Sequence, residues 1–486
     1  MKKILHSCFI ICGLMLSLTG CSKFTEITPK GSNILNRVSD LDLILNYNFS
    51  YNSNATPTSL AGTTSAGEGF NPMDAEELVD DLYPVALNVT TLLSGGTKDL
   101  NYALITYDET IDRKNLATSD AKYEKLYFII NNVANVVIKN ADVASGDRTK
   151  ANQLKAEAYI IRAYMHYLLV NFYSKAYNPA TAATDGGIPY VKEDNVISDP
   201  NKKSTVADVY NNIVGDIDAA FALNSLPATP VNNMRVGQGF AYAVRAQVLL
   251  SMRNYTGALA AANASLAINS TVIDNNTFAP VGTATFARPI LTSPDNLFYA
   301  SYKGTPTLNT ISPDVLANYF EKGNIINDYV KPYYPSVSGS FGISGVTGAP
   351  LWYTAPYANN SAGLTTLDTY FIKAECLART QNVSGAIDII NMIRKKRIIA
   401  SAYTPFTAAT EAQAIGYLKK TTHSEFLFTF KNYLNMKRWN TEDAYKETVT
   451  RTVNGKTYQL KPESSLWIFP FPQSGTAYNP NLTQNY

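Results

Sequence analysis

The chain has 486 residues, of which 16% are charged and 45% are hydrophobic. Its 41 basic and 39 acidic side chains give a formal net charge of +2, a near-neutral balance that argues against nucleic acid or an anionic membrane surface as the partner. The 32 tyrosines suit a surface that stacks on and hydrogen-bonds neutral polar ligands, and they suit a large core equally well.

The first twenty residues have the charge, apolar and small-residue order of an export signal. Two lysines precede an apolar run over residues 4–18, and Gly20 stands directly before Cys21. The run is shorter than the roughly 20 residues that a membrane-spanning helix needs. The Leu-x-Gly-Cys arrangement resembles the bacterial lipobox, in which the cysteine becomes the acylated first residue. We therefore expect cleavage before Cys21, a lipid such as palmitate on Cys21 as the anchor, and a tether over residues 21–36.

The remaining cysteines exclude a disulfide framework. Cys8 and Cys12 leave with the signal and Cys21 is expected to be lipidated, so only Cys376 is left. A mature chain of about 466 residues can bury a large core without a disulfide. We expect one domain over residues 37–486.

Apolar residues spaced three and four apart predict a scaffold of helical hairpins over about 121–268 and 366–440. The first hairpin pairs residues 149–173 with residues 205–223, and Thr205-x-x-Asp208 has the form of a capping box at the start of its second helix. A less regular hairpin is predicted to join residues 409–420 to residues 425–439, followed by a tail over residues 441–486.

Two further hairpins repeat each other in sequence. Residues 241–266 align without a gap on residues 369–394, with identical residues at seven positions that include Asn254/Asn382 and Gly257/Gly385. Small residues at fixed positions let two antiparallel helices pack closely. The pattern resembles the tetratricopeptide hairpin, whose units stack into a superhelix.

Two insertions, about residues 50–120 and 267–365, interrupt this scaffold and are rich in Gly, Pro, Ser, Thr and Asn. Long loops on a rigid scaffold are where binding sites usually lie. The first insertion contains an acidic run from Glu68 to Asp81, which we interpret first as solvated surface or rim, then as a ligand or cation contact, and last as a catalytic site.

Motifs for catalysis or metal binding are missing from the sequence. After removal of the signal only His166 and His423 remain, far apart and without a nearby cysteine. His166 lies within a predicted helix, where a structural role is expected. We therefore predict a binding protein rather than an enzyme, without a metal site and without a cofactor other than the lipid.

Several longer motifs stand in a fixed order along the chain. They are FTEITPKG (24–31), YFIINNVANVV (127–137), RAY (162–164), GGIPYV (186–191), EFLFTFKNYLNMKRW (425–439) and PFPQSGTAYNPNLTQNY (470–486). Together they resemble the SusD/RagB family of nutrient-binding outer-membrane lipoproteins of Bacteroidetes. Thr429, Phe430 and Asn432 stand where this family usually has Glu, Gly and Arg, which sets the chain apart from the best-known members.

The resemblance implies a mainly α fold, in which tetratricopeptide-like hairpins form a right-handed superhelical scaffold and loop-rich mixed insertions carry the ligand face. It also implies a surface-exposed, lipid-anchored protein of the outer membrane. Such a protein captures an oligosaccharide and delivers it to a SusC-like TonB-dependent transporter. A peptide ligand, as in the RagB branch, is the alternative.

The tryptophans separate structural positions from candidate ligand contacts. Trp439 and Trp467 lie in or beside the family-like motifs and are predicted to be structural, whereas Trp352 lies in a Gly/Pro-rich stretch where no periodicity requires a core residue. Aromatic faces stack on sugar rings, and neighbouring polar groups bind the hydroxyls. The predicted ligand contacts are Trp352, Tyr353 and Tyr357, then Tyr333 and Tyr334, and from the first insertion Glu68, Phe70 and Tyr83.

Overall fold

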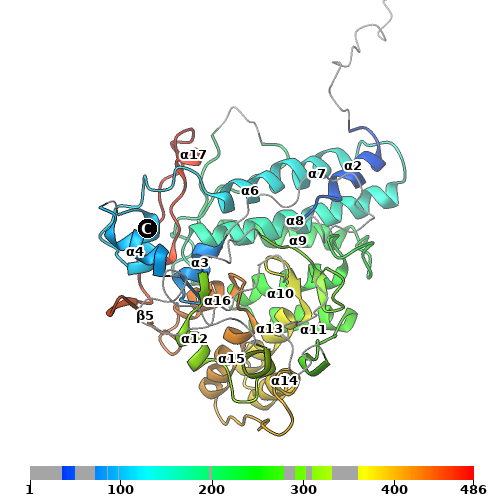
Figure 1. Cartoon of the computed structure of the whole chain (residues 1–486). Coiled ribbons are helices and arrows are strands. Elements are labelled where there is room, and N and C mark those ends of the chain that lie inside the picture. Colours follow the sequence, from blue (N-terminus) through cyan, green and yellow to red (C-terminus); the bar gives the residue numbers. More distant parts are fainter. Residues whose placement is uncertain are drawn as a thin grey trace, which may run out of the picture.

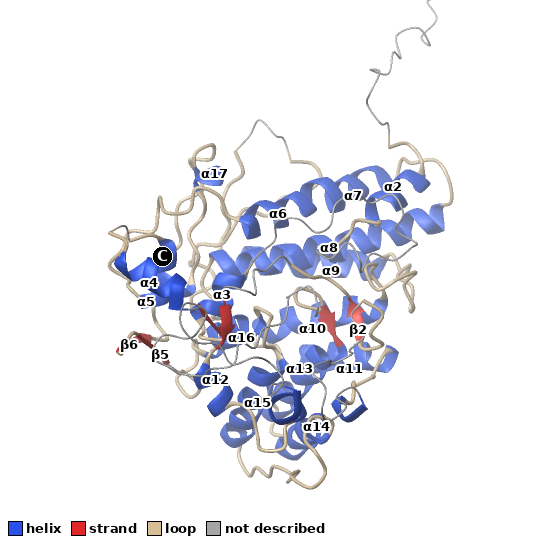
Figure 2. Ribbon diagram, viewed as in Figure 1, coloured by secondary structure: helices blue, strands red, loops and turns tan. Residues whose placement is uncertain are grey.

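The computed structural model describes residues 35–49, 72–84, 86–96, 98–195, 200–277, 291–302, 309–330 and 360–486. Helices dominate these residues, and the strands are short and paired two by two (Figure 2). The mainly helical fold predicted from the sequence is therefore confirmed. Among the same residues, no helix combines the length and apolar character that crossing a membrane requires.

The longest helix, α8, organises the upper half of the molecule as it is drawn in Figure 1. It packs against α9 as the predicted first hairpin, and helices α2, α6 and α7 also contact it. A π-helical turn joins α6 to α7, so the two form one continuous helical run. The bounds are α2 (Val38–Leu45), α6 (Ala121–Ile129), the π turn (Ile130–Ala134), α7 (Asn135–Ala141), α8 (Arg148–Tyr173) and α9 (Val206–Ala222).

The predicted capping box at the start of α9 is confirmed. The Thr205 hydroxyl accepts a hydrogen bond from the backbone N–H of Asp208 at 3.1 Å, and the Asp208 carboxylate accepts one from the backbone N–H of Thr205. Two N–H groups that the helix leaves unpaired at its first turn are thus satisfied.

The two repeated hairpins form the lower half of the molecule and have the same turn. Asn254 and Asn382 cap their second helices by accepting hydrogen bonds from the N–H groups of Gly257 and Gly385, at 2.9 and 3.0 Å. A Cβ atom at either glycine would lie within 3.0 Å of the capping amide, which explains why glycine recurs there. The bounds are α10 (Gln238–Ser251), α11 (Tyr255–Ile268), α13 (Thr366–Arg379) and α14 (Val383–Lys395).

The two hairpins stack on each other because α11 packs against α13. The residue before each capping asparagine has a positive φ, +61° at Arg253 and +66° at Gln381, so the chain reverses direction through a left-handed residue in both turns. The repeat in sequence is therefore a repeat in structure, as predicted.

The predicted position of the turn between the last two helices, between residues 420 and 425, was wrong. Helix α15 (Glu411–Glu425) continues through the polar stretch that we assigned to a turn, and α16 (Lys431–Trp439) begins only after residue 430. The hydroxyls of Thr421 and Thr422 donate to carbonyls one turn back, at 2.9 Å each, and so are satisfied inside the helix. The chain breaks at Phe428 instead, with φ +62°.

Short elements between the hairpins connect the scaffold to the insertions. Strand β1 (Leu82–Pro84) pairs antiparallel with β3 (Asn309–Ile311), and β2 (Asn296–Phe298) with β4 (Leu364–Thr365). A hairpin of β5 (Val449–Val453) and β6 (Lys456–Leu460) turns at Asn454-Gly455, both with positive φ, as a tight hairpin requires. The short helices are α3 (Met73–Leu78), α4 (Ala86–Ser94), α5 (Leu100–Thr106), α12 (Pro313–Asn318) and α17 (Gln473–Thr476), with a π turn over Ile325–Val330 and single 3-10 turns over Asn275–Thr277 and Ser465–Trp467.

Candidate functional site

Segments of the two insertions meet on the scaffold at one small patch, which we call the loop base (residues 47–49, 299–302 and 360–362). There the N–H of Ser301 donates to the carbonyl of Phe49 at 3.0 Å, and the N–H of Ala362 donates to the carbonyl of Ala300 at 2.9 Å. The first insertion begins directly after Phe49, and residues 299–302 and 360–362 are two segments of the second insertion. The loop base therefore brings the start of the first insertion together with two segments of the second.

Aromatic side chains hold the loop base on the long helix of the scaffold. The Tyr164 hydroxyl, from the middle of α8, donates to the carbonyl of Ala362 at 2.8 Å. The ring of Phe298 stacks on Phe240 of α10 with centroids 4.4 Å apart, and Phe49 meets Phe298 edge-on at 5.0 Å. All of these side chains are buried, so the loop base is a rigid part of the core.

The acidic run in the first insertion is mostly buried, which corrects our interpretation of it as solvated surface. Glu76 and Asp81 are 0% exposed and Asp80 is 5% exposed. A carboxylate survives inside a protein only when it is paired or protonated, and four acids of this run have partners on distant segments. The pairs are Asp74 with Lys122, Glu76 with Tyr302, Asp80 with Arg451 and Ser312, and Asp81 with Asn432 and His423.

The pair between Asp80 and Arg451 ties the β5–β6 hairpin to the segment between α3 and β1. Arg451 is 0% exposed, and its Nε lies 2.6 Å from Asp80 Oδ1. The guanidinium also donates to the carbonyl oxygens of Leu104 and Ile105, at 3.3 and 3.2 Å. Burial raises the pKa of Asp80, and the charge of Arg451 opposes that rise.

Glu76 joins α3 to the loop base. The Tyr302 hydroxyl donates to Glu76 Oε1 and lies 3.3 Å from the carbonyl of Phe428. Among the described residues no group hydrogen-bonds Glu76 Oε2. Burial raises the pKa of Glu76 well above its ordinary value of 4.5, and the hydrogen bond from Tyr302 only partly offsets that rise.

The predicted ligand contacts fall almost entirely outside the described residues. Tyr83 is the exception, and its position does not support a ligand contact. Its ring is 3% exposed, it packs in a cluster with Val89, Ile105 and Val453, and its hydroxyl donates to the carbonyl of Thr452 at 3.0 Å. A ring enclosed in this way has no free face for a sugar. The predicted residues outside the described ranges are Cys21, Glu68, Phe70, Tyr333, Tyr334, Trp352, Tyr353 and Tyr357.

His166 and the two structural tryptophans occupy the positions that the sequence predicts for them. His166 accepts a hydrogen bond from the N–H of Val191 at 3.1 Å, and burial lowers its pKa to about 3, so the ring is neutral. The indole N–H of Trp439 donates to Glu375 at 3.1 Å, and that of Trp467 donates to the carbonyl of Lys461 at 2.9 Å. Both tryptophans are buried in the scaffold.

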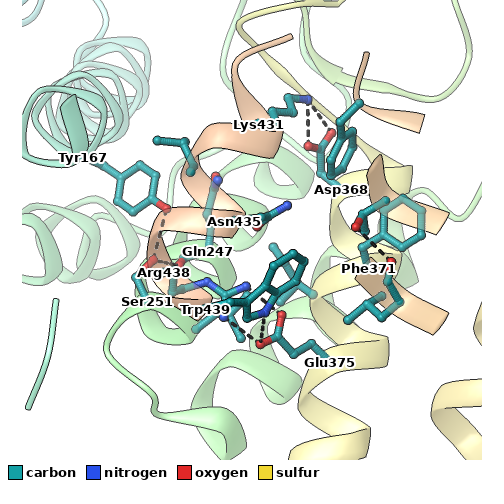
Figure 3. Close-up of a pocket in the computed structure, with 16 residues that line it drawn as sticks. Tyr167, Gln247, Ser251, Asp368, Phe371, Glu375, Lys431, Asn435, Arg438 and Trp439 are labelled. Atoms are coloured by element: carbon teal, nitrogen blue, oxygen red, sulfur yellow. Dashed lines mark hydrogen bonds and ion pairs between the residues drawn. The ribbon is translucent and has the colours of Figure 1, made fainter. Parts of the chain in front are cut away.

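Trp439 also lines an interior cavity between α13 and α16, where Arg438 pairs with Glu375 and Lys431 pairs with Asp368 (Figure 3). The cavity holds only about 40 Å³, enough for a few water molecules but far below the several hundred Å³ of a typical ligand site. It belongs to the structural interior. Nowhere in the described part of the chain do three or more His, Cys, Asp or Glu side chains gather as metal ligands would.

Comparison with known families and structures identifies the fold. A profile described as "Starch-binding associating with outer membrane" matches residues 76–250, and a profile described as "SusD family" matches residues 366–486. The chain therefore belongs to the SusD/RagB family.

Individual relatives are distant. The SusD-like protein P2 of Formosa agariphila is 29% identical over 155 residues, a match that covers 31% of this chain and 27% of that protein. A SusD superfamily protein from Bacteroides thetaiotaomicron has the same fold, with a TM-score of 0.67 at 17% identity over 93% of this chain and 100% of that one. A SusD-like carbohydrate binding protein from Bacteroides vulgatus has a TM-score of 0.63 at 15% identity, over 92% and 97% of the two chains.

Proposed function

We propose that this protein is a cell-surface lipoprotein, anchored in the outer membrane by lipid on Cys21. It captures an oligosaccharide and delivers it to a SusC-like TonB-dependent transporter. The loop base is the observation that carries the proposal, because it brings segments of both insertions together on a rigid scaffold. Membership of a family whose matched profile is described as starch-binding and associated with the outer membrane supports the same role.

Insertions held on a packed scaffold suit capture of the ligand by their loops rather than by the scaffold helices. Loops held at their ends by a packed core can vary in sequence while the frame that positions them stays unchanged. Phe70 and Trp352 lie in the two insertions that share the loop base, so aromatic and polar groups from both can act on one ligand. In this proposal the tether keeps the protein beside its transporter, where it acts as a lid.

Replacing Trp352 with Ala tests the ligand platform. We expect an oligosaccharide that the wild type binds to lose about tenfold in affinity, roughly 1.4 kcal/mol, because a stacked indole is a typical binding hot spot. Calorimetric titration against a glycan panel measures the change. Tyr478→Ala is the matched control, since Tyr478 is an 85% exposed aromatic in the tail, outside both insertions. Equal affinity of the Trp352→Ala variant and the wild type would remove Trp352 from the site.

Isolation of the native protein from detergent-solubilised outer membranes tests the transporter role. We expect a TonB-dependent barrel to co-purify with the wild type, and the Cys21→Ser variant to be lost from the membrane fraction. Recovery of the anchored protein without any barrel, and no barrel gene beside its own, would contradict delivery to a transporter.

A peptide ligand is the second candidate, and the small number of tryptophans outside the scaffold favours it. Trp439 and Trp467 are buried in the scaffold, so Trp352 is the single tryptophan left for stacking on a sugar. A peptide depends more on backbone hydrogen bonds and less on aromatic stacking. Depletion of a defined peptide mixture by the immobilised protein, measured by mass spectrometry beside the glycan panel, distinguishes the two ligands.

A further inference from the structure

A second cavity is lined by residues of α15 and α16 and by two residues at the end of α12, and none of its lining residues belongs to the loop base. It encloses about 270 Å³, close to the lower end of the range for small-molecule sites. Met436 and Trp439, both buried, form apolar parts of its lining. This space suits one sugar ring and is too small for an oligosaccharide chain.

The part of the cavity wall that contains Tyr319 is held in place by contacts of Tyr319 itself and of Glu321. The Tyr319 ring stacks on His423 with centroids 3.6 Å apart and planes 7° from parallel, and His423 Nε2 lies 2.6 Å from Asp81 Oδ1. Two residues further along, Glu321 pairs with Arg394 at 2.6 Å. A wall fixed in this way needs little ordering when a ligand enters, which favours binding.

Among the described residues, one cation that lines the cavity has no ion pair. Lys419 pairs with Glu447 and donates to the carbonyl of Tyr445 at 2.7 Å. Lys420 also lines the cavity, and it has no ion pair or hydrogen bond with any residue that the structure describes. A carboxylate on the ligand would give Lys420 an ion-pair partner.

Polar groups that suit hydroxyls lie next to Lys420. Asn318 and Tyr319 line the cavity from the end of α12. Burial raises the pKa of Tyr319, and the nearby charge of Glu447 raises it further, so its hydroxyl stays protonated and can donate a hydrogen bond. The Lys420 cation matches a carboxylate on the ligand, and the Asn318 amide and the Tyr319 hydroxyl match hydroxyls on the same sugar ring.

We propose that this cavity binds one acidic sugar residue. The sugar carboxylate pairs with Lys420, and Asn318 and Tyr319 bind its hydroxyls. Asn318 and Tyr319 belong to the second insertion, and none of the residues that line the cavity is among the ligand contacts predicted from the sequence. The proposal does not rest on the proposed transport role.

Titration of the full mature protein with sodium D-glucuronate tests the proposal, with D-glucose and sodium acetate as the neutral-sugar and simple-anion comparisons. We expect saturable binding of glucuronate with a dissociation constant on the order of millimolar, and at least tenfold weaker binding of glucose and acetate. The variant Lys420→Gln is expected to bind glucuronate no better than glucose.

Gly416 provides a variant that blocks the cavity without disturbing the core. It lines the cavity on α15, and a Cβ atom there would have no atom within 4 Å, so Gly416→Phe can place its ring in the open space. Gly215→Phe on α9 is the matched control, because a Cβ atom there also meets nothing within 4 Å and Gly215 is not part of the cavity lining. We expect Gly416→Phe to abolish glucuronate binding and Gly215→Phe to retain it, with similar thermal unfolding.

Three results would overturn the proposal. They are no detectable binding of glucuronate by the wild type, equal binding of glucuronate and either comparison compound, and unchanged binding in a folded Gly416→Phe variant. None of them bears on the Trp352 and transporter experiments, so the two proposals can fail independently.

Discussion

The turns of the repeated hairpins and the segment beneath the loop base are stabilised by different interactions. Each turn is held by a cap that acts within a few residues, Asn254 in one and Asn382 in the other. The segment beneath the loop base depends on buried charges, among them the pair of Asp80 and Arg451. A buried charge that loses its partner costs far more than a lost cap. We therefore expect the loss of a cap in the hairpin turns to be tolerated and the loss of a buried charge beneath the loop base to be severe.

Replacing Arg451 with Met gives the largest expected effect. It leaves the Asp80 carboxylate buried without its cation and should lower the free energy of unfolding by about 3–5 kcal/mol. Urea denaturation measures the loss. Arg245→Met is the matched control, since the Arg245–Asp218 pair is partly exposed, with 35% and 54% of the side chains accessible, and should cost about 1 kcal/mol or less. Equal losses in the two variants would contradict the contrast between the regions.

Replacing Glu76 with Gln tests the loop base through pH. Because its raised pKa makes the folded protein hold this proton more tightly than the unfolded chain, Glu76 contributes its full stability below pH 4.5. That stability is lost as pH rises from 4.5 towards the folded-state pKa, at about 1.4 kcal/mol per pH unit for one proton. We expect the variant to lack this contribution to the pH dependence. Urea unfolding midpoints of the wild type and the variant, measured from pH 4 upward, follow this pH dependence. Parallel curves of midpoint against pH for the two proteins would refute the role of Glu76.

Replacing either capping asparagine with Ala gives the smallest effect. Each substitution removes one hydrogen bond at the start of a helix and should cost about 1 kcal/mol. Since the two turns have the same geometry, Asn254→Ala and Asn382→Ala should lower the unfolding free energy by similar amounts. A large difference between them would show that the two hairpins are not equivalent in energy.

The scaffold could be predicted from the sequence because its interactions are local. The spacing of apolar residues, the capping box at Thr205 and the repeated Asn-x-x-Gly turn all act within a few residues of each other. The break at Phe428 was missed because threonine hydroxyls can bond either to water or to the helix, and the sequence does not distinguish these outcomes.

The loop base and the buried pairs beneath it could not be predicted, since their partners lie far apart along the chain. One signal was present and was overlooked. In strand β5, Arg451 lies two residues from both Val449 and Val453. Because side chains two apart in a strand point to the same face, all three lie on the buried face. A buried arginine implies an acidic partner, and that would have shown that part of the acidic run in the first insertion lies inside the protein. The sequence still could not have shown which acid pairs with it.

The long separations along the chain also order the events of folding. Tyr164 and Ala362 are 198 residues apart, and Asp80 and Arg451 are 371 apart. Such contacts form only after long stretches of chain have been brought together, whereas the hairpins close over a few residues. The hairpins should therefore form first and the loop base last. A molecule with complete helices can still lack the attachment of its two insertions, so native helix content alone does not report a protein that is ready to bind.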